Sequence, residues 1–201
     1  MTLFADPSFF VLLAAAVAAA AAIGLSGHTL RHYGLAVSVG FLTCVFLKTP
    51  AQLVALLCFV AAARASVLFL ARNPKDRRRY LVSVAATLSP LVVYKVSAVF
   101  DQSLWGFVGV SYVTFKAVQV VIETRDGLIK AMSPLDWLYF VCFFPVFTSG
   151  PIDRSRRFVE DAHRRWTREE YADLLSRGLL LLLAGAVYQM VLATIAGGWY
   201  S

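Results

Sequence analysis

Long apolar stretches dominate this sequence and restrict the folds open to it. They lie at about 8–25, 33–47, 51–70, 81–100, 106–122, 135–149 and 178–196. Charged residues make up only 15% of the 201 residues, against about a quarter in a typical soluble domain. No polar stretch between them is long enough to bury a core of its own. The sequence therefore predicts an all-α fold, a multi-pass transmembrane helical bundle of about six spans, with residues 1–201 as a single transmembrane domain.

The first apolar stretch could be a cleaved signal peptide or a retained span. The residues before it, "MTLFADP", contain an acid and no lysine or arginine, so the basic region of a signal peptide is missing. Its apolar core is also longer than that of a signal peptide. We interpret residues 8–25 as a retained membrane span.

The net charge of +7 is concentrated in two places. Residues 71–80 carry five basic groups and one acid, and residues 150–177 carry seven arginines and six acids. Basic loops beside apolar spans are typical of the cytoplasmic side of a membrane, which makes a nucleic-acid partner the less favoured interpretation. We expect a membrane protein with an external N-terminus and with basic loops 71–80 and 150–177 in the cytoplasm.

The segment 135–149 does not fit this topology as a simple span. Its 15 residues would reach only about 22 Å as a helix, whereas the apolar core of a bilayer is about 30 Å thick. Pro145 lacks an N–H and disfavours helix at the preceding residue. We predict a broken or re-entrant segment near 135–152 that turns at "TSGP", followed by an amphipathic surface stretch before the span 178–196. The alternative is a short tilted span with an external arginine-rich loop.

Four polar residues recur along one face of the segment 106–122 and its end. Tyr112, Lys116, Gln119 and Glu123 are spaced i, i+4, i+7 and i+11. Ionisable groups in a span usually face the bundle interior or a wet path. One chain of hydrogen bonds could satisfy Lys116, Gln119 and Glu123. Two interpretations stay open, a substrate path and a structural polar clamp between helices.

The histidines and cysteines indicate no catalytic or metal centre. His28 and His32 are four residues apart, but no acidic or cysteine partner lies nearby, which favours interfacial histidines. His163 lies among arginines and is expected to be solvated. The three cysteines have no CxxC spacing, and no GxSxG, HExxH or phosphate-binding loop is present. We expect no bound metal or cofactor.

Two longer motifs carry a family resemblance. "GVSYVTFKAVQVVIETRDGLIK" (109–130) and "YFVCFFPVFTSGPIDRSRRFVED" (139–161) resemble the membrane-bound O-acyltransferase (MBOAT) family, and within it the branch that acts in teichoic-acid D-alanylation. The resemblance is strong over 109–161 and rests on hydropathy upstream. It implies a funnel-shaped helical bundle with a thinned centre, of which this chain is the N-terminal half.

The resemblance also implies a reaction and partners. Such enzymes move an acyl group, here D-alanyl, from the phosphopantetheine thioester of a small carrier protein to an acceptor hydroxyl of a cell-envelope polymer. Membrane lipids and the acyl carrier protein are the expected partners. The residues expected near the substrate path are Lys116, Gln119, Glu123, Ser149, Asp153 and Arg154.

This chain departs from the family pattern in one respect. The essential histidine of the family lies in an apolar helix of the second half of a longer protein, and no residue here matches it. The resemblance therefore implies that no catalytic residue is present, that the isolated chain is inactive, and that a C-terminal half bearing the histidine is needed. The alternatives are a non-catalytic membrane scaffold that binds a partner, and an enzyme that transfers acetyl to an exopolysaccharide.

Overall fold

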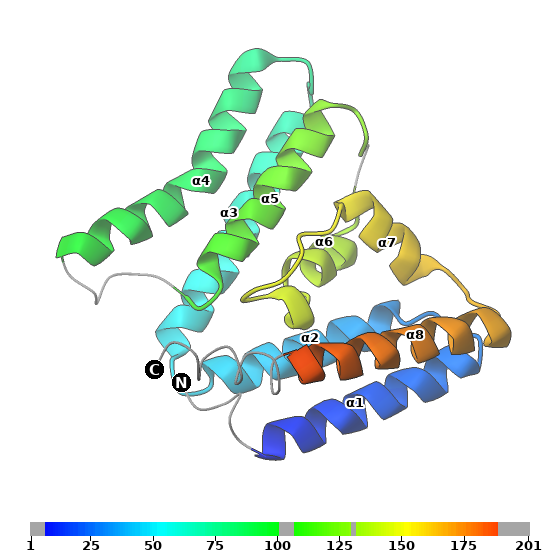
Figure 1. Cartoon of the computed structure of the whole chain (residues 1–201). Coiled ribbons are helices and arrows are strands. Elements are labelled where there is room, and N and C mark those ends of the chain that lie inside the picture. Colours follow the sequence, from blue (N-terminus) through cyan, green and yellow to red (C-terminus); the bar gives the residue numbers. More distant parts are fainter. Residues whose placement is uncertain (1–6, 101–106, 130–131, 189–201) are drawn as a thin grey trace. The chain divides into compact units, whose positions relative to one another are not determined.

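The computed structural model describes residues 7–100, 107–129 and 132–188, and these residues form helices without a β-strand (Figure 1). The elements are α1 (Pro7–Leu25), α2 (Arg31–Phe46), α3 (Pro50–Ala71), α4 (Arg77–Phe100), α5 (Val110–Arg125), α6 (Pro134–Val141), a 3₁₀ turn η2 (Phe144–Val146), α7 (Ser155–His163) and α8 (Arg168–Val187). The prediction of an all-α fold is confirmed for this part of the chain.

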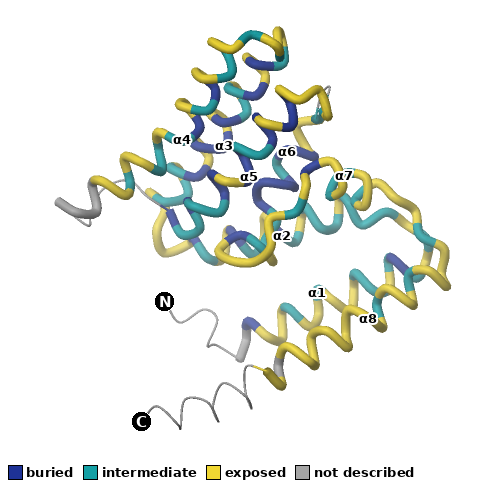
Figure 2. The backbone as a smooth tube through the Cα atoms, turned by 45° about the horizontal axis from the view of Figure 1, so that its top comes forward, coloured by how far each residue is buried: buried dark blue, intermediate teal, exposed yellow. Residues whose placement is uncertain are grey.

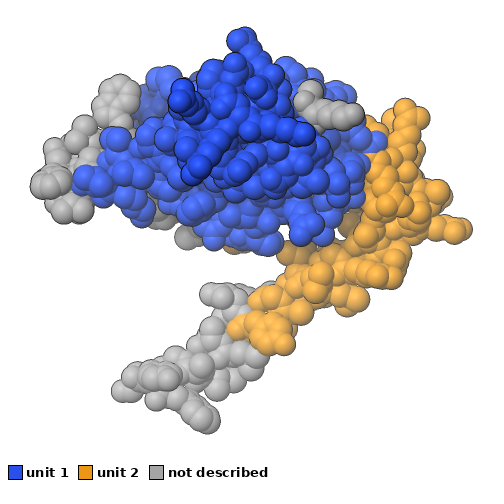
Figure 3. Space-filling model, turned by 90° about the horizontal axis from the view of Figure 1, so that it is seen from above, with its two compact units in different colours: residues 1–3, 31–163 blue, residues 4–30, 164–201 orange. Residues whose placement is uncertain are grey.

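The chain divides into two compact units, coloured separately in Figure 3. The larger unit contains α2 to α7, and the smaller unit contains α1 and α8. The single transmembrane domain over residues 1–201 stays a prediction.

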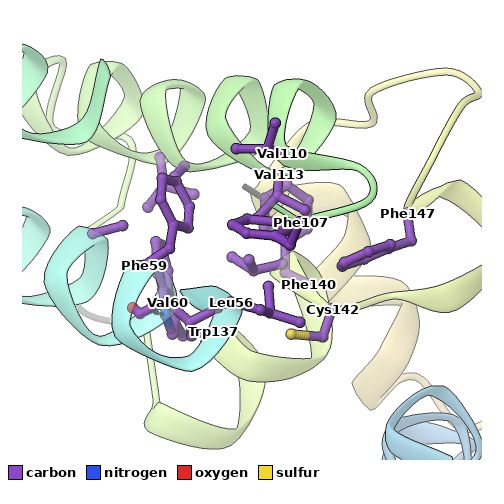
Figure 4. Packing of buried hydrophobic residues seen from close by; sticks show 14 of the residues in the cluster. Leu56, Phe59, Val60, Phe107, Val110, Val113, Trp137, Phe140, Cys142 and Phe147 are labelled. Atoms are coloured by element: carbon purple, nitrogen blue, oxygen red, sulfur yellow. Dashed lines mark hydrogen bonds between the residues drawn. The ribbon is translucent and has the colours of Figure 1, made fainter. Parts of the chain in front are cut away.

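The core of the larger unit lies where α3, α4 and α5 pack against one another and α6 joins α3 and α5 (Figure 1). One face of α5 is fully buried, because apolar residues recur there at helical spacing. That face comprises Val113, Ala117, Val120 and Val121. Aromatic side chains from several elements pack in the core beside this face of α5 (Figure 4). Among them, Trp137 Nε1 donates a hydrogen bond to Val60 O at 3.2 Å.

The smaller unit pairs α1 with α8. The Tyr171 hydroxyl donates a hydrogen bond to Ala20 O at 3.2 Å. The ring lies where Gly24 has no side chain, since a Cβ there would be 2.1 Å from the Tyr171 ring. Both helices are largely exposed in Figure 2, and the leucines 179–183 have exposed fractions of 47–74%.

One helix of the described residues combines the length and apolarity of a membrane span. This helix is α3, with 22 residues and a mean hydropathy of 2.4 over its most apolar window. The helix Phe9–Leu25 is apolar but shorter, and α5 has 16 residues. The remaining spans of the predicted six stay a prediction.

The break near 135–152 is confirmed. α6 has only 8 residues, about 12 Å of helix, and begins where the Ser133 hydroxyl accepts a hydrogen bond from Asp136 N at 3.1 Å. The chain then forms η2 around Pro145 and turns at Gly150, whose φ of +128° favours glycine. That the segment enters and leaves the membrane on one side stays a prediction.

One sequence-based boundary was wrong, and one stretch predicted as a loop between spans contains helices. Residues 150–177, predicted as a cytoplasmic basic loop, contain α7 and the first half of α8, and their location on the cytoplasmic side stays a prediction. The predicted surface stretch and the following span are one continuous helix, α8, as far as Val187. A capping box starts it, with Thr167 and Glu170 bonding each other's backbone N–H groups, and Gly178 does not interrupt it.

The broken segment packs directly on the start of α5. Gly109 precedes α5 with φ +86°, and a Cβ there would lie 2.6 Å from Phe147 O. Only glycine combines this backbone conformation with so close an approach. The end of the 3₁₀ turn is therefore held against the N-terminus of the helix that carries the polar stripe.

Candidate functional site

Lys116 is the most deeply buried ionisable residue of the stripe on α5, with 1% of its surface exposed. Its ammonium donates a hydrogen bond to Phe140 O in α6 at 3.1 Å and lies 5.5 Å from the centroid of the Phe140 ring. A buried ammonium needs such partners, because burial without them is costly. Lys116 is therefore bonded to the broken segment and not to its neighbours on the stripe.

Gln119 and Glu123 form a second network. Gln119 Nε2 donates to Glu123 Oε1 at 3.0 Å, and the fully buried Ser155 hydroxyl donates to Glu123 Oε2. The predicted single chain of hydrogen bonds through Lys116, Gln119 and Glu123 is thus wrong, since Lys116 bonds elsewhere. The sequence analysis did not identify Ser155, which lies among the arginines of "DRSRRF". Its hydrogen bond to Glu123 connects α7 to α5.

A groove of about 610 Å³ lies beside this second network. Its wall is apolar, formed by Phe115, Val118, Ile122, Leu128 and Ile152. Gln119, Glu123, Arg154 and Arg156 also line it. An apolar cavity with a few polar groups is the usual form of a ligand site.

The other predicted path residues are placed differently. Ser149 is exposed beyond η2 and does not line the groove. Asp153 is half-buried and pairs with Arg157 at 2.8 Å. Tyr112 is half-buried at the first turn of α5. The structure thus brings Gln119, Glu123 and Arg154 to one groove and leaves Ser149 and Asp153 outside its lining.

A second polar cluster was not predicted. Asp136 is nearly buried and accepts hydrogen bonds from Arg31 Nε at 2.6 Å and from the Ser133 hydroxyl at 2.6 Å. His163 Nε2 lies 2.9 Å from the same carboxylate. The cluster connects α2, α6 and the end of α7. Its signal was the acid in the otherwise apolar "SPLDWLYF", three residues after a capping serine.

The histidines have no evident catalytic geometry. His163 is only half exposed, so the prediction that it is solvated was partly wrong: its ring is bound to Asp136. Ser26 Oγ lies 3.1 Å from His28 Nδ1, but that hydroxyl donates its hydrogen to Ile23 O at 2.7 Å. His32 is exposed. In the described part of the chain no cluster of three metal-binding side chains occurs.

One charged side chain outside the apolar segments, Glu170, has a lowered pKa. Glu170 accepts hydrogen bonds from the Thr167 backbone and hydroxyl, and these bonds lower the pKa of the Glu170 carboxyl. Arg164 lies 3.4 Å from the same carboxylate and adds to the effect. The pair belongs to the start of α8 and has a capping role.

Comparison with known proteins gives one consistent result. No family model matches the chain. The chain is similar to the teichoic acid D-alanyltransferase of Bacillus subtilis, with 35% identity over 96% of this chain and 52% of that protein. It is 37% identical to the protein of the same name from Streptococcus thermophilus, over 82% of this chain and 41% of that protein. The chain therefore spans about half the length of the curated relatives it matches.

Proposed function

We propose that this chain forms the N-terminal part of a teichoic acid D-alanyltransferase of the membrane-bound O-acyltransferase type, in a bacterial cell membrane. The observation that carries the proposal is the similarity to the Bacillus subtilis protein over nearly the whole chain. The all-helical fold and the broken segment between α6 and α7 are compatible with a bundle built around a thin centre.

The reaction we propose for the complete enzyme is acyl transfer from a thioester to a hydroxyl. The acceptor oxygen attacks the thioester carbonyl, the hydroxyl proton leaves to a base, and the C–S bond of the carrier's phosphopantetheine arm breaks. At neutral pH the base is most often a histidine with a pKa near 7, held within hydrogen-bond reach of the acceptor.

The part of this chain in the reaction is structural. Of its histidines, His28 and His32 are exposed, and His163 is bound to Asp136. No serine or lysine in the described residues lies beside one of them in an activating arrangement. The base is therefore assigned to the portion of the relatives that this chain does not match, and this chain supplies scaffold and part of the funnel wall.

The test is an acyl-transfer assay with a D-alanyl thioester on a purified carrier protein. The 201-residue chain alone should transfer no label to teichoic acid. Transfer should appear when a polypeptide covering the unmatched portion of a relative is co-expressed. The matched control is that second polypeptide without this chain, which should also be inactive.

Three outcomes would contradict the proposal. Turnover by this chain alone that is lost in His163→Gln would place the base here, on the Asp136 pair. No transfer by the co-expressed pair, with both parts shown to associate, would favour the non-catalytic scaffold. Transfer of acetyl but not of D-alanyl would favour the exopolysaccharide alternative.

A further inference from the structure

The groove beside Glu123 combines an open apolar wall with a lining that holds two arginines and one acid. Four of the apolar residues that line it are 40–54% exposed, namely Phe115, Ile122, Leu128 and Ile152. Apolar side chains this exposed in one groove are typical of a site that receives an apolar ligand or a membrane. The wall therefore fits a hydrocarbon chain.

The arginines that line the groove are available to an anion. The Arg154 guanidinium has no hydrogen bond or ion pair within the described residues, and only its backbone is bonded: its N–H donates to Asp153 Oδ1 and its carbonyl accepts from Phe158 N. Arg156 makes one pair, with Glu160 at 3.6 Å, in which both side chains are more than half exposed. Such surface pairs contribute little, so Arg156 can exchange its partner at small cost.

The acid in the groove offsets one of the two positive charges and leaves the lining with more arginines than acids. Glu123 also lines it, but both of its oxygens already accept hydrogen bonds, from Gln119 and from Ser155. Asp153 is paired with Arg157. The groove therefore presents two guanidinium groups and one carboxylate, and that carboxylate is bonded to Gln119 and Ser155 and to neither arginine.

From these observations we infer that the groove binds an anionic phospholipid, with its phosphate on Arg154 and Arg156 and an acyl chain along Phe115 and Ile122. Guanidinium groups match phosphate oxygens in a bidentate geometry. Basic residues beside apolar helices on the cytoplasmic side recognise anionic headgroups in this way. The inference does not depend on the proposed acyl transfer, because the site and its test require no turnover.

The test is a thermal-shift titration of the 201-residue chain in detergent with short-chain phosphatidylglycerol. Phosphatidylcholine with the same acyl chains serves as the zwitterionic lipid. We expect phosphatidylglycerol to bind at least tenfold more tightly and the difference to shrink as salt is added. Soluble glycerol 1-phosphate should not compete at the same concentration, because it lacks the chain that contacts the apolar wall.

Paired variants separate the groove from general surface charge. Each basic group near an anionic headgroup contributes about a fivefold gain in affinity, so Arg154→Gln with Arg156→Gln should weaken phosphatidylglycerol binding about 25-fold. Arg72→Gln with Arg78→Gln removes the same charge from the exposed turn before α4 and its first residues, and should change binding less than fivefold. Circular dichroism and the melting temperature in phosphatidylcholine check that both double variants fold.

Three results would overturn the inference. The first is equal affinity for the two lipids. The second is an equal loss in the two double variants, which would mean non-specific attraction to basic residues. The third is a second copy of the chain in the groove, seen as cross-linking between Ile152→Cys proteins that phosphatidylglycerol does not reduce.

Discussion

Arg31 Nε lies 2.6 Å from Asp136 Oδ1, so the first residue of α2 is bonded to the first turn of α6 across 105 positions of the chain. The Arg31 side chain is 16% exposed and the Asp136 side chain 7%, which makes this the least exposed ion pair of the described residues. The Asp136 carboxylate also accepts a hydrogen bond from the Ser133 hydroxyl and contacts His163 Nε2. Three segments of the larger unit therefore depend on one acid.

Removing the charge of Asp136 should lower the free energy of unfolding. Asp136→Asn leaves the Arg31 guanidinium nearly buried without a charged partner, and we expect a loss of about 3 kcal/mol in the free energy of unfolding. Glu160→Gln makes the same chemical change in the exposed pair with Arg156 and should cost much less. Unfolding in detergent, followed by tryptophan fluorescence, measures both. Equal losses in the two variants would show that the buried pair contributes no more to the free energy of unfolding than the exposed pair.

The bond between Ser155 and Glu123 should appear as an energetic coupling. In a double-mutant cycle of Glu123→Gln and Ser155→Ala, the two changes should be non-additive by about 1 kcal/mol or more, because Ser155→Ala removes the donor of this bond and Glu123→Gln removes the charge that strengthens it. Ser83→Ala removes a different bond, to Ser66 O, and should be additive with Glu123→Gln. Coupling of equal size in both cycles would mean that a general loosening of the bundle is being measured.

Membrane topology can be tested by labelling single cysteines in a cysteine-free background. Asn73 and Ser176 are exposed and lie in stretches that we predict to be cytoplasmic. Cysteines at either position should escape an impermeant maleimide in intact cells and react after permeabilisation. Labelling of position 176 alone in intact cells would support the tilted-span alternative. Ser155 is unsuitable, because its side chain is fully buried whatever the topology.

The start of α8 should weaken in acid. The pKa of Glu170 is lowered in the folded chain, so its contribution to stability is complete above its ordinary value of 4.5 and is lost as pH falls further. Hydrogen exchange at the Thr167 amide should accelerate in Glu170→Gln at pH 7. The variant and the wild type should converge as pH falls from 4.5 through the lowered pKa of Glu170, once the intrinsic exchange rates are taken into account. A difference that does not shrink as pH falls below 4.5 would exclude the carboxylate as its source.

Local patterns predicted the helical class and the break after α6 because their causes lie within a few residues. Ser133 and Pro134 start α6, while Pro145 and Gly150 interrupt the segment after it, and each of these effects acts through its own backbone. The spacing of Lys116, Gln119 and Glu123 likewise placed them on one side of α5.

Local sequence patterns could not predict which residues form hydrogen bonds between different helices. Nothing near Lys116 in sequence indicates that its ammonium meets Phe140 O, and nothing near Arg31 indicates Asp136. Both bonds depend on how helices pack, and spacing along one helix carries no information about the neighbour. The continuous α8 was missed for a related reason, since a change from polar to apolar residues marks a change of surroundings and does not end a helix.

The bond from Lys116 to Phe140 O has a consequence for how α6 ends. The last four carbonyls of any helix lack a partner within it, and Phe140 is the penultimate residue of α6. Where water is excluded, a carbonyl left in this way must find a donor elsewhere, and a cation at the negative end of a helix is the most favourable one. Lys116 is that donor. Lys116 therefore satisfies a carbonyl at the end of α6 from a position 24 residues earlier in the chain, and a substitution at Lys116 would leave that carbonyl without its donor in a helix to which Lys116 does not belong.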